Sequence, residues 1–151
     1  MFETADECRH VLCAQIEASS RYVDIVSDDL LPSVLNNDDV VTAFTRLARR
    51  GRQTRIRLLL KDFHTERLVG HKLIGLARRL TTALEIHVLS GHPEWPGSTW
   101  ILCDRSEGLS VKSVSPPVGS VLSHPEAKRL SETFDRLWLA SHETPELRTI
   151  I

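Results

Sequence analysis

The sequence predicts an α/β fold in which a mixed, mostly parallel sheet is flanked by helices. Three observations predict it. Short runs with β-branched or alternating apolar residues recur along the chain, such as residues 22–27 and 84–89. Between the first three of these runs, the chain has stretches with apolar residues at helical spacing. Two later runs follow each other across a short turn, which favours a hairpin.

Four helices are expected, at residues 4–19, 38–50, 65–80 and 125–141. Asp38 or Asp39 can cap the second helix, and Gly51 is a natural stop for it. In the third helix, the apolar side chains at positions 69, 73, 76 and 80 form one stripe that is suited to a core. The intervening residues 32–37 have the composition of a turn.

Five strands are expected, at residues 22–27, 54–60, 84–89, 99–103 and 109–114. In the second strand, Ile56 and Leu58 share one face while Arg55 and Arg57 point to the other. Strands that are separated by helices favour parallel pairing with right-handed crossovers. Residues 91–97 and 115–123 are rich in Pro, Gly and Ser and are expected to be loops.

Length and composition indicate one ordinary globular domain. The 151 residues are enough to bury a core without disulfides, and we expect a single domain over 1–151 with a loose tail at 143–151. Hydrophobic residues make up 41%, charged residues 26%, and the formal net charge is −1. A net charge this close to zero gives no overall electrostatic attraction to nucleic acid or to an anionic membrane, so neither is the expected partner.

The cysteines and the apolar runs bear on the compartment. Cys8, Cys13 and Cys103 form an odd, sparse set without a CxxC pair, which predicts reduced thiols and a cytoplasmic protein. The first residues lack the basic and apolar regions of a signal peptide. No apolar run has the length of a membrane span, so none is expected.

Several segments, in order, resemble half-domains of the phospholipase D-like family that occur in bacterial proteins. Residues 16–30 resemble the first helix and strand, and residues 44–62 resemble a helix, Arg-Gly and a strand ending in Asp. Residues 84–88 match the strand before the active-site loop, and residues 134–141, Phe-Asp-Arg-Leu-Trp-Leu-Ala-Ser, resemble the closing helix with its Phe-x3-Trp. The order of these segments, which together span nearly the whole chain, carries the resemblance.

The same comparison shows where the family's chemical residues are missing. The family places His-x-Lys-x4-Asp where this chain has Gly97, Thr99 and Asp104. It also carries Gly-Ser-x-Asn about seven residues further on, where this chain has Val-Lys-Ser-Val around Lys112. In the family the His attacks phosphorus and the Lys holds the phosphoryl oxygens, roles that Gly97 and Thr99 do not supply.

The resemblance therefore implies a catalytically inactive domain that acts in binding, regulation or dimerisation. It implies no catalytic residue, no metal and no cofactor, and it makes Gly97, Thr99, Asp104 and Lys112 the vestigial-site positions. Active members pair two halves about a two-fold axis, so we expect a homodimer with an interface near Thr99 and Lys112. Related domains also occur attached to bacterial acetyltransferases, so a separate enzyme of that kind is a second candidate partner.

Two alternatives stay open. Asp28, Asp29, Asp62 and Asp104 each follow a predicted strand, where acids could hold Mg²⁺ for a metal-dependent or residual phosphohydrolase. Turn formation and helix capping are the more common uses of such residues. An adjacent His71-Lys72 pair on a helix does not converge on one point, and solvated side chains are the simpler interpretation.

The second alternative is a phosphate-backbone, or nucleic-acid, binding module. It rests on a dense basic cluster, in which Arg49, Arg50 and Arg52 are the candidate phosphate-binding residues. Few aromatic residues are interleaved for base stacking, so a solvated helix end is the expected interpretation. Trp95 and Trp100 flank the vestigial motif and either wall a pocket there or cover the end of the core.

Overall fold

The computed structural model describes residues 1–61, 70–112 and 116–143. Its helices are α1 (Ala5–Ala18), α2 (Pro32–Leu35), α3 (Asp38–Ala48), α5 (Lys72–Arg79) and α6 (His124–Ala140). Its strands are β1 (Tyr22–Ser27), β2 (Arg55–Leu60), β3 (Leu84–Val88), β4 (Thr99–Cys103), β5 (Glu107–Lys112), β6 (Val118–Val121) and β7 (His142–Glu143). The predicted α/β class is confirmed.

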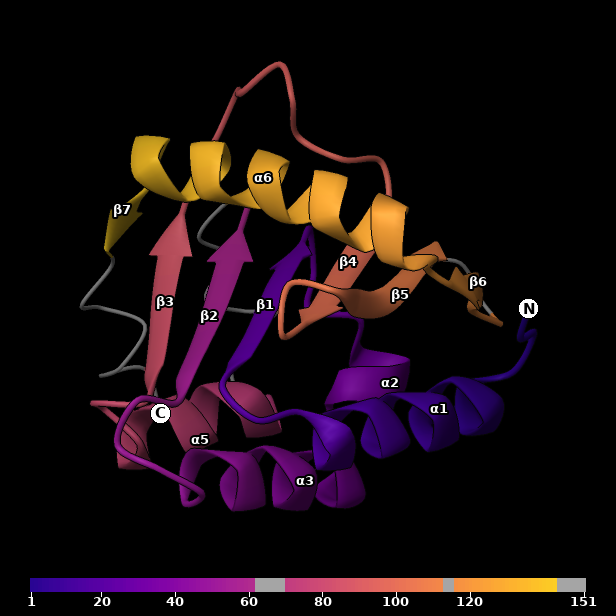
Figure 1. Ribbon diagram of the computed structural model, residues 1–151, viewed down its shortest axis with the longest axis vertical. Coiled ribbons are helices and arrows are strands. Elements are labelled where there is room, and N and C mark those ends of the chain that lie inside the picture. The colour runs from indigo at the N-terminus through magenta and orange to yellow at the C-terminus, as the bar shows by residue number, and fades with distance from the viewer. Residues whose placement is uncertain (62–69, 113–115, 144–151) are drawn as a thin grey trace.

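All seven strands form one sheet in the order β6-β5-β4-β1-β2-β3-β7 (Figure 1). The three early strands are parallel, because α2 and α3 connect β1 to β2, and α5 lies in the crossover from β2 to β3. The other four pairings are antiparallel. The expectation of a mostly parallel sheet was therefore wrong, because the second half of the chain adds β4, β5 and β6 beside β1 and β7 beside β3, all through antiparallel pairing.

The sheet separates two hydrophobic clusters of unequal size. Helices α1, α2, α3 and α5 cover one face, and α6 crosses the other (Figure 1). Phe44, Leu58 and Ile101 belong to the larger cluster, under the four helices. Phe134, Leu59 and Leu102 belong to the smaller cluster, under α6. Alternate residues of β2 and β4 thus point to opposite clusters, which is the strand periodicity the sequence predicted.

Local capping explains where the helices begin. Asn37, rather than Asp38 or Asp39, caps α3, and its side chain accepts hydrogen bonds from the N–H groups of Asp39 and Val40. Ser123 and Glu126 form a capping box at the start of α6. His71 caps α5, so the described part of the helix expected at 65–80 runs from Lys72 to Arg79; residues 62–69 lie outside the described residues.

Three short elements were not predicted. The turn-like residues 32–37 contain α2, with Pro32 at its first turn. The expected loop at 115–123 contains β6, which pairs with β5 from Leu109 to Lys112. Glu143, the first residue of the expected loose tail, belongs to β7 and pairs with His87; the rest of that tail lies outside the described residues. Within the described ranges, no helix combines the length and hydropathy of a membrane span.

Candidate functional site

The strand directions place the predicted site residues at two ends of the sheet. The Thr99 end is where β1, β2 and β3 finish, at Ser27, Leu60 and Val88, and where β4 begins. The Asp104 end is the opposite one, where β1, β2 and β3 begin and β4 finishes. Thr99 and Asp104 are five residue steps apart along a mostly extended chain, a span of roughly 17 Å. The vestigial motif is therefore divided between the two ends.

Thr99 is buried at the end of the sheet where β1, β2 and β3 finish. Its side chain is 1% exposed, and its Oγ1 lies 2.8 Å from Oγ of Ser27, which is equally buried. Ser27 Oγ also accepts a hydrogen bond from the N–H of Leu30 at 3.0 Å. Gly97 is exposed in the preceding loop, and a Cβ added there would meet nothing within 4 Å. The position of the family's Lys thus serves to join β4 to β1.

The acids beside Thr99 are engaged in turn and loop contacts. Asp29 Oδ1 accepts a hydrogen bond from the N–H of Leu31, which has a left-handed backbone. Asp28 Oδ1 accepts one from Nε1 of Trp95 at 2.6 Å, which ties the loop before β4 to the end of β1. Trp95 and Trp100 are partly buried against the smaller core cluster. Trp95 therefore contacts both the loop and the core.

The metal hypothesis gains no geometric support from these acids. Asp104 lies at the other end of the sheet from Asp28 and Asp29, because β4 runs antiparallel to β1. Asp62 lies outside the described residues. Among the residues that the structure describes, no group of three or more His, Cys, Asp or Glu side chains is placed to hold a metal ion. The expectation that Asp104 could hold a metal ion together with Asp28 and Asp29 is therefore wrong.

Lys112 ends β5 close to Thr99, since Thr99 is paired with Val111. It is exposed, and it borders a small hollow of about 220 Å³. Ser98 and Ser110 both belong to its lining, and their Oγ atoms are hydrogen-bonded at 3.0 Å. We call it the serine hollow; it is lined by Met1, Ser98, Ser110, Lys112, Val118, Gly119 and Ser120. The structure thus brings Thr99 and Lys112 near each other but on opposite faces of neighbouring strands.

Asp104 has a structural position. Its carboxylate accepts hydrogen bonds from the backbone N–H groups of Ser20, Arg21 and Tyr22 at 2.8, 2.9 and 3.0 Å. Burial alone would raise the pKa of Asp104, but these three bonds and the nearby charge of Arg50 lower it below the ordinary value of 3.8. Its backbone is left-handed, with φ 50°, a conformation that Asp tolerates better than most residues. Asp104 therefore fixes the entry into β1.

The side chains of His71 and Lys72 also make structural contacts. His71 is 4% exposed; its Nδ1 accepts the N–H of Leu73, and its Nε2 lies 3.1 Å from the carbonyl oxygen of Leu30. Nε2 must therefore carry the proton and donate it to that carbonyl. Burial lowers the pKa of His71, which keeps the ring neutral. Lys72 points outward and pairs with Asp38 at 2.7 Å.

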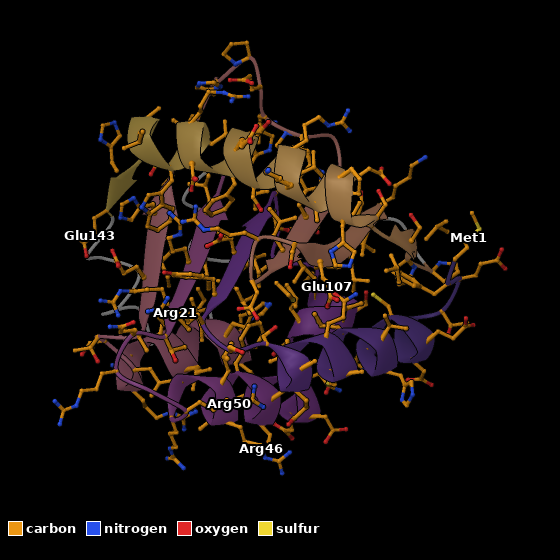
Figure 2. All side chains as sticks on the ribbon, in the orientation of Figure 1. Met1, Arg21, Arg46, Arg50, Glu107 and Glu143 are labelled. Carbon is orange, nitrogen blue, oxygen red and sulfur yellow. The ribbon has the colours of Figure 1, made fainter. Side chains whose placement is uncertain are left out.

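The basic cluster of the sequence separates into three groups. Arg46 and Arg50 are labelled in Figure 2, and both pair with Glu17 of α1. Arg50 also donates to the carbonyl oxygens of Ile16 and Ser19. Arg50 thus closes the C-terminal end of α1 and is committed to structure. Its proposed role in phosphate binding receives no support from these contacts.

A second group lines a cavity at the Asp104 end. Arg49, Arg52 and Arg55 surround a hollow of about 350 Å³ beside the start of β2. We call it the arginine cavity; its lining consists of Ala48, Arg49, Gly51, Arg52, Thr54, Arg55, Thr82 and Ala83. Two of the three candidate phosphate-binding residues, Arg49 and Arg52, are therefore together, with Arg55 as a third member.

Arg57 forms the third group, a buried ion cluster that the sequence analysis missed. Its guanidinium donates to both carboxylate oxygens of Asp24 at 2.7 and 3.0 Å and to Asp135 of α6 at 3.0 Å. It also lies over the rings of Phe134 and Trp138, at 4.8 and 5.3 Å from their centroids. Burial raises the pKa of Asp24 despite the opposing effect of Arg57. Charged residues inside two otherwise apolar strands were the signal that could have revealed this pair.

The same face carries a stacked histidine. His87 of β3 packs on Trp138 with ring centroids 3.7 Å apart, and its Nδ1 lies 2.7 Å from Oγ of Ser141. Burial lowers the pKa of His87. Together with Arg57, it fastens the C-terminal half of α6 to β2 and β3. These contacts account for the position of the closing helix.

Solved structures show which fold this arrangement represents. NucT from Helicobacter pylori covers 93% of this chain and 92% of its own, with a TM-score of 0.67 and 9% identity. The phospholipase D family member Nuc from Salmonella typhimurium covers 90% of each chain, with a TM-score of 0.63 and 10% identity. The archaeal chromatin protein TrmBL2, described as showing a novel mode of DNA binding, matches with a TM-score of 0.64 and 16% identity. The fold is that of a phospholipase D-like domain.

The family follows from the sequence itself. The chain belongs to the family described as "Domain of unknown function (DUF7931)", whose model matches residues 4–150. No curated protein matches it significantly. The match to TrmBL2 covers 95% of this chain and 53% of the archaeal protein, so this chain spans about half of that protein's length.

Proposed function

We propose that this domain is a catalytically inactive phospholipase D-like module that acts in binding, regulation or dimerisation. The observation that carries the proposal is the state of Thr99. Thr99, at the family's Lys position, is buried, and its hydroxyl group is hydrogen-bonded to that of Ser27. Gly97, at the family's His position, has no side chain. The chemistry needs a nucleophile and a cation at one point, and these two positions supply neither.

The fate of Asp104 supports the same proposal. The one acid of the motif that the chain retains is bound to three backbone N–H groups at the far end of β4. A structural role is sufficient to explain its presence without any phosphodiesterase activity. We expect a cytoplasmic protein with reduced thiols, as the buried Cys8 and Cys103 and the partly buried Cys13 are all unpaired.

A direct test is hydrolysis of bis-p-nitrophenyl phosphate, with and without Mg²⁺, by the purified protein. We expect wild type, Thr99→Val and a double variant Asp28→Asn with Asp29→Asn to give the same background rate. Turnover by wild type that the double variant loses would overturn the inactive assignment and favour the metal-dependent alternative. Turnover that only Thr99→Val loses would place a nucleophile or donor at the vestigial position.

Dimerisation is the module's proposed mode of assembly, with an isologous interface beside Thr99 and Lys112. The serine hollow supports this location, because in the described part of the chain it is a concave surface whose lining includes the exposed Met1. Sedimentation equilibrium should give the mass of a dimer for wild type and of a monomer for Ser110→Trp, which fills the hollow. Arg129→Trp, on the exposed side of α6, should remain dimeric. A monomeric wild type would contradict this interface.

A further inference from the structure

The arginine cavity contains a buried polar group that the fold leaves unused. Thr54 is 2% exposed, and its Oγ1 is one of three buried side-chain polar atoms that have no hydrogen-bond partner among the described residues. Buried hydroxyl groups normally have a partner, because an unpaired one loses its hydrogen bonds to water without compensation. Thr54 belongs to the lining of the cavity, but its Oγ1 is closed to solvent, so this hydroxyl can reach a group bound there only when its side chain rotates.

In the part of the chain that the structure describes, the side-chain charges around Thr54 are positive and have no paired acid. Arg49, Arg52 and Arg55 contribute three guanidinium groups to the lining, and no carboxylate belongs to it. Within the described ranges, none of the three arginines pairs with an acid, whereas Arg46 and Arg50 both share Glu17. Three neighbouring cations without counter-charge repel one another, and a bound anion removes that repulsion.

Part of the cavity wall is already held in place. Nη1 of Arg55 donates to the carbonyl oxygens of Thr54 and Arg52 at 3.1 and 3.5 Å, which folds its guanidinium back over the loop. The carbonyl groups in the last turn of α3 already accept hydrogen bonds from the backbone N–H groups of Arg49 and Arg50. They therefore do not require donors from the arginine side chains. Capping of the helix end therefore does not explain the three side chains.

The basic surface continues beyond this cavity. A second hollow of about 270 Å³, lined by Thr45, Arg49, Leu76, Arg79 and Leu80, shares Arg49 with the arginine cavity. Arg79, at the end of α5, thus extends the row of guanidinium groups. Neither hollow has an aromatic residue in its lining, so no aromatic ring there can stack a nucleobase.

From these observations we propose that the arginine cavity is a binding site for a phosphate group. The planar guanidinium groups of Arg49, Arg52 and Arg55 hold the phosphoryl oxygens. The side chain of Thr54 rotates when the phosphate binds, and its Oγ1 then donates a hydrogen bond to one of these oxygens. Guanidinium groups match phosphate through paired N–H donors, which is why this residue type in this number favours a phosphate over a single-point anion. The phosphate belongs either to a small phosphorylated ligand or to the backbone of a nucleic acid.

The site lies at the end of the sheet opposite to Thr99 and does not depend on the inactivity proposed there. β2 begins directly after Thr54 and ends at the Thr99 end, six residues away, a distance of roughly 20 Å. A failure of the hydrolysis test would leave the arginine cavity untouched. Conversely, absence of phosphate binding would leave the inactive assignment standing.

Calorimetric titration with inorganic pyrophosphate tests the site. Wild type should bind, and a variant carrying Arg52→Gln and Arg55→Gln should bind about tenfold more weakly, since two guanidinium groups are lost. Thr54→Val removes only the hydroxyl and should weaken binding about threefold. The matched control carries Lys128→Gln and Arg129→Gln, two exposed cations of α6, and should stay within about twofold of wild type.

Thermal melting without ligand shows whether each variant is folded. Thr54→Val is the decisive variant, because it keeps the shape of the side chain and should not lower the melting temperature. No binding of millimolar pyrophosphate by wild type would overturn the proposal, as would an equal loss in the control variant. The same holds if Thr54→Val and the double arginine variant both bind as wild type does.

A second arm distinguishes the two sources of phosphate. Fluorescence anisotropy with a labelled single-stranded DNA of about 20 nucleotides is measured at low and physiological salt. If the source is a nucleic-acid backbone, DNA binding should fall with salt, be displaced by pyrophosphate, and weaken in the double arginine variant. Pyrophosphate binding without DNA binding assigns the cavity to a small phosphorylated ligand.

Discussion

The two ends of the sheet differ in how their polar groups are used. At the Thr99 end, buried hydroxyl groups satisfy each other, as Thr99 does with Ser27. At the Asp104 end, the carboxylate of Asp104 accepts hydrogen bonds from three backbone N–H groups. At the same end, among the described residues, Thr54 Oγ1 has no hydrogen-bond partner and the three arginines of the cavity have no acid partner. Thr99 and Asp104, which align with the family's motif, thus make structural contacts, whereas the proposed phosphate site lies elsewhere at the Asp104 end.

The largest effect is expected at Asp104. Asp104→Ala leaves the N–H groups of Ser20, Arg21 and Tyr22 without their acceptor and places Ala in a left-handed backbone. We expect the free energy of unfolding to fall by about 2–3 kcal/mol, measured by urea denaturation. Glu107→Ala, an exposed acid three residues away (Figure 2), is the matched control and should change it by less than about 0.5 kcal/mol.

The pH dependence at the same residue is the second prediction. The folded-state pKa of Asp104 is lowered from its ordinary value of 3.8, so its contribution is fully present above that value and is lost as the pH falls through the folded-state pKa. Asp104→Asn cannot be ionised, and it should be less stable than wild type at pH 7. The gap between their melting temperatures should close as the pH is lowered below about 4. A gap that stays constant would contradict the role of the charge.

A smaller effect is expected at the other end. Thr99→Val removes one hydroxyl from the pair with Ser27, whose Oγ keeps its bond from the N–H of Leu30. The expected loss in unfolding free energy is about 1 kcal/mol. Thr42→Val, at an exposed position of α3, is the control and should be close to neutral. A loss at Thr99 as large as that at Asp104 would break the contrast between the two ends.

The smallest effect is expected at Thr54. Thr54→Val replaces a hydroxyl that has no partner in the described part of the chain, so the unfolding free energy should stay the same or rise slightly. Measured beside Thr99→Val, this substitution compares a paired with an unpaired buried hydroxyl in one protein. A destabilisation of about 1 kcal/mol or more would show that Thr54 Oγ1 serves the fold itself.

Much of the fold could be predicted because its signals are local. The spacing of apolar residues placed β1, β2, β3 and β4, and Gly51 marked the turn after α3. β6 and β7 were missed because they are edge strands of four and two residues, whose composition is that of a loop and a helix end. Their pairing with β5 and β3 comes from tertiary contact, which has no periodicity in the sequence.

The sites were harder to predict, because side chains distant in sequence determine each role. Arg46, Arg49, Arg50 and Arg57 look alike in the sequence, yet Glu17 binds two of them, Asp24 and Asp135 bind another, and the fourth lines a cavity. The charge of a side chain does not by itself predict which of these contacts an arginine makes. The missing His and Lys were the exception, since an absent side chain is visible without any structure.

The short outer strands also have a consequence for self-association. β6 has four residues and its outer side is partly occupied by a bridge from Phe2 to Gly119, while β7 offers only two residues at the opposite border. Long exposed borders invite strand addition and aggregation. Within the described residues, β7 covers only His87 and Val88 of β3, so each border of the sheet leaves only a short stretch of backbone open to strand addition. Short borders of this kind disfavour growth into fibres.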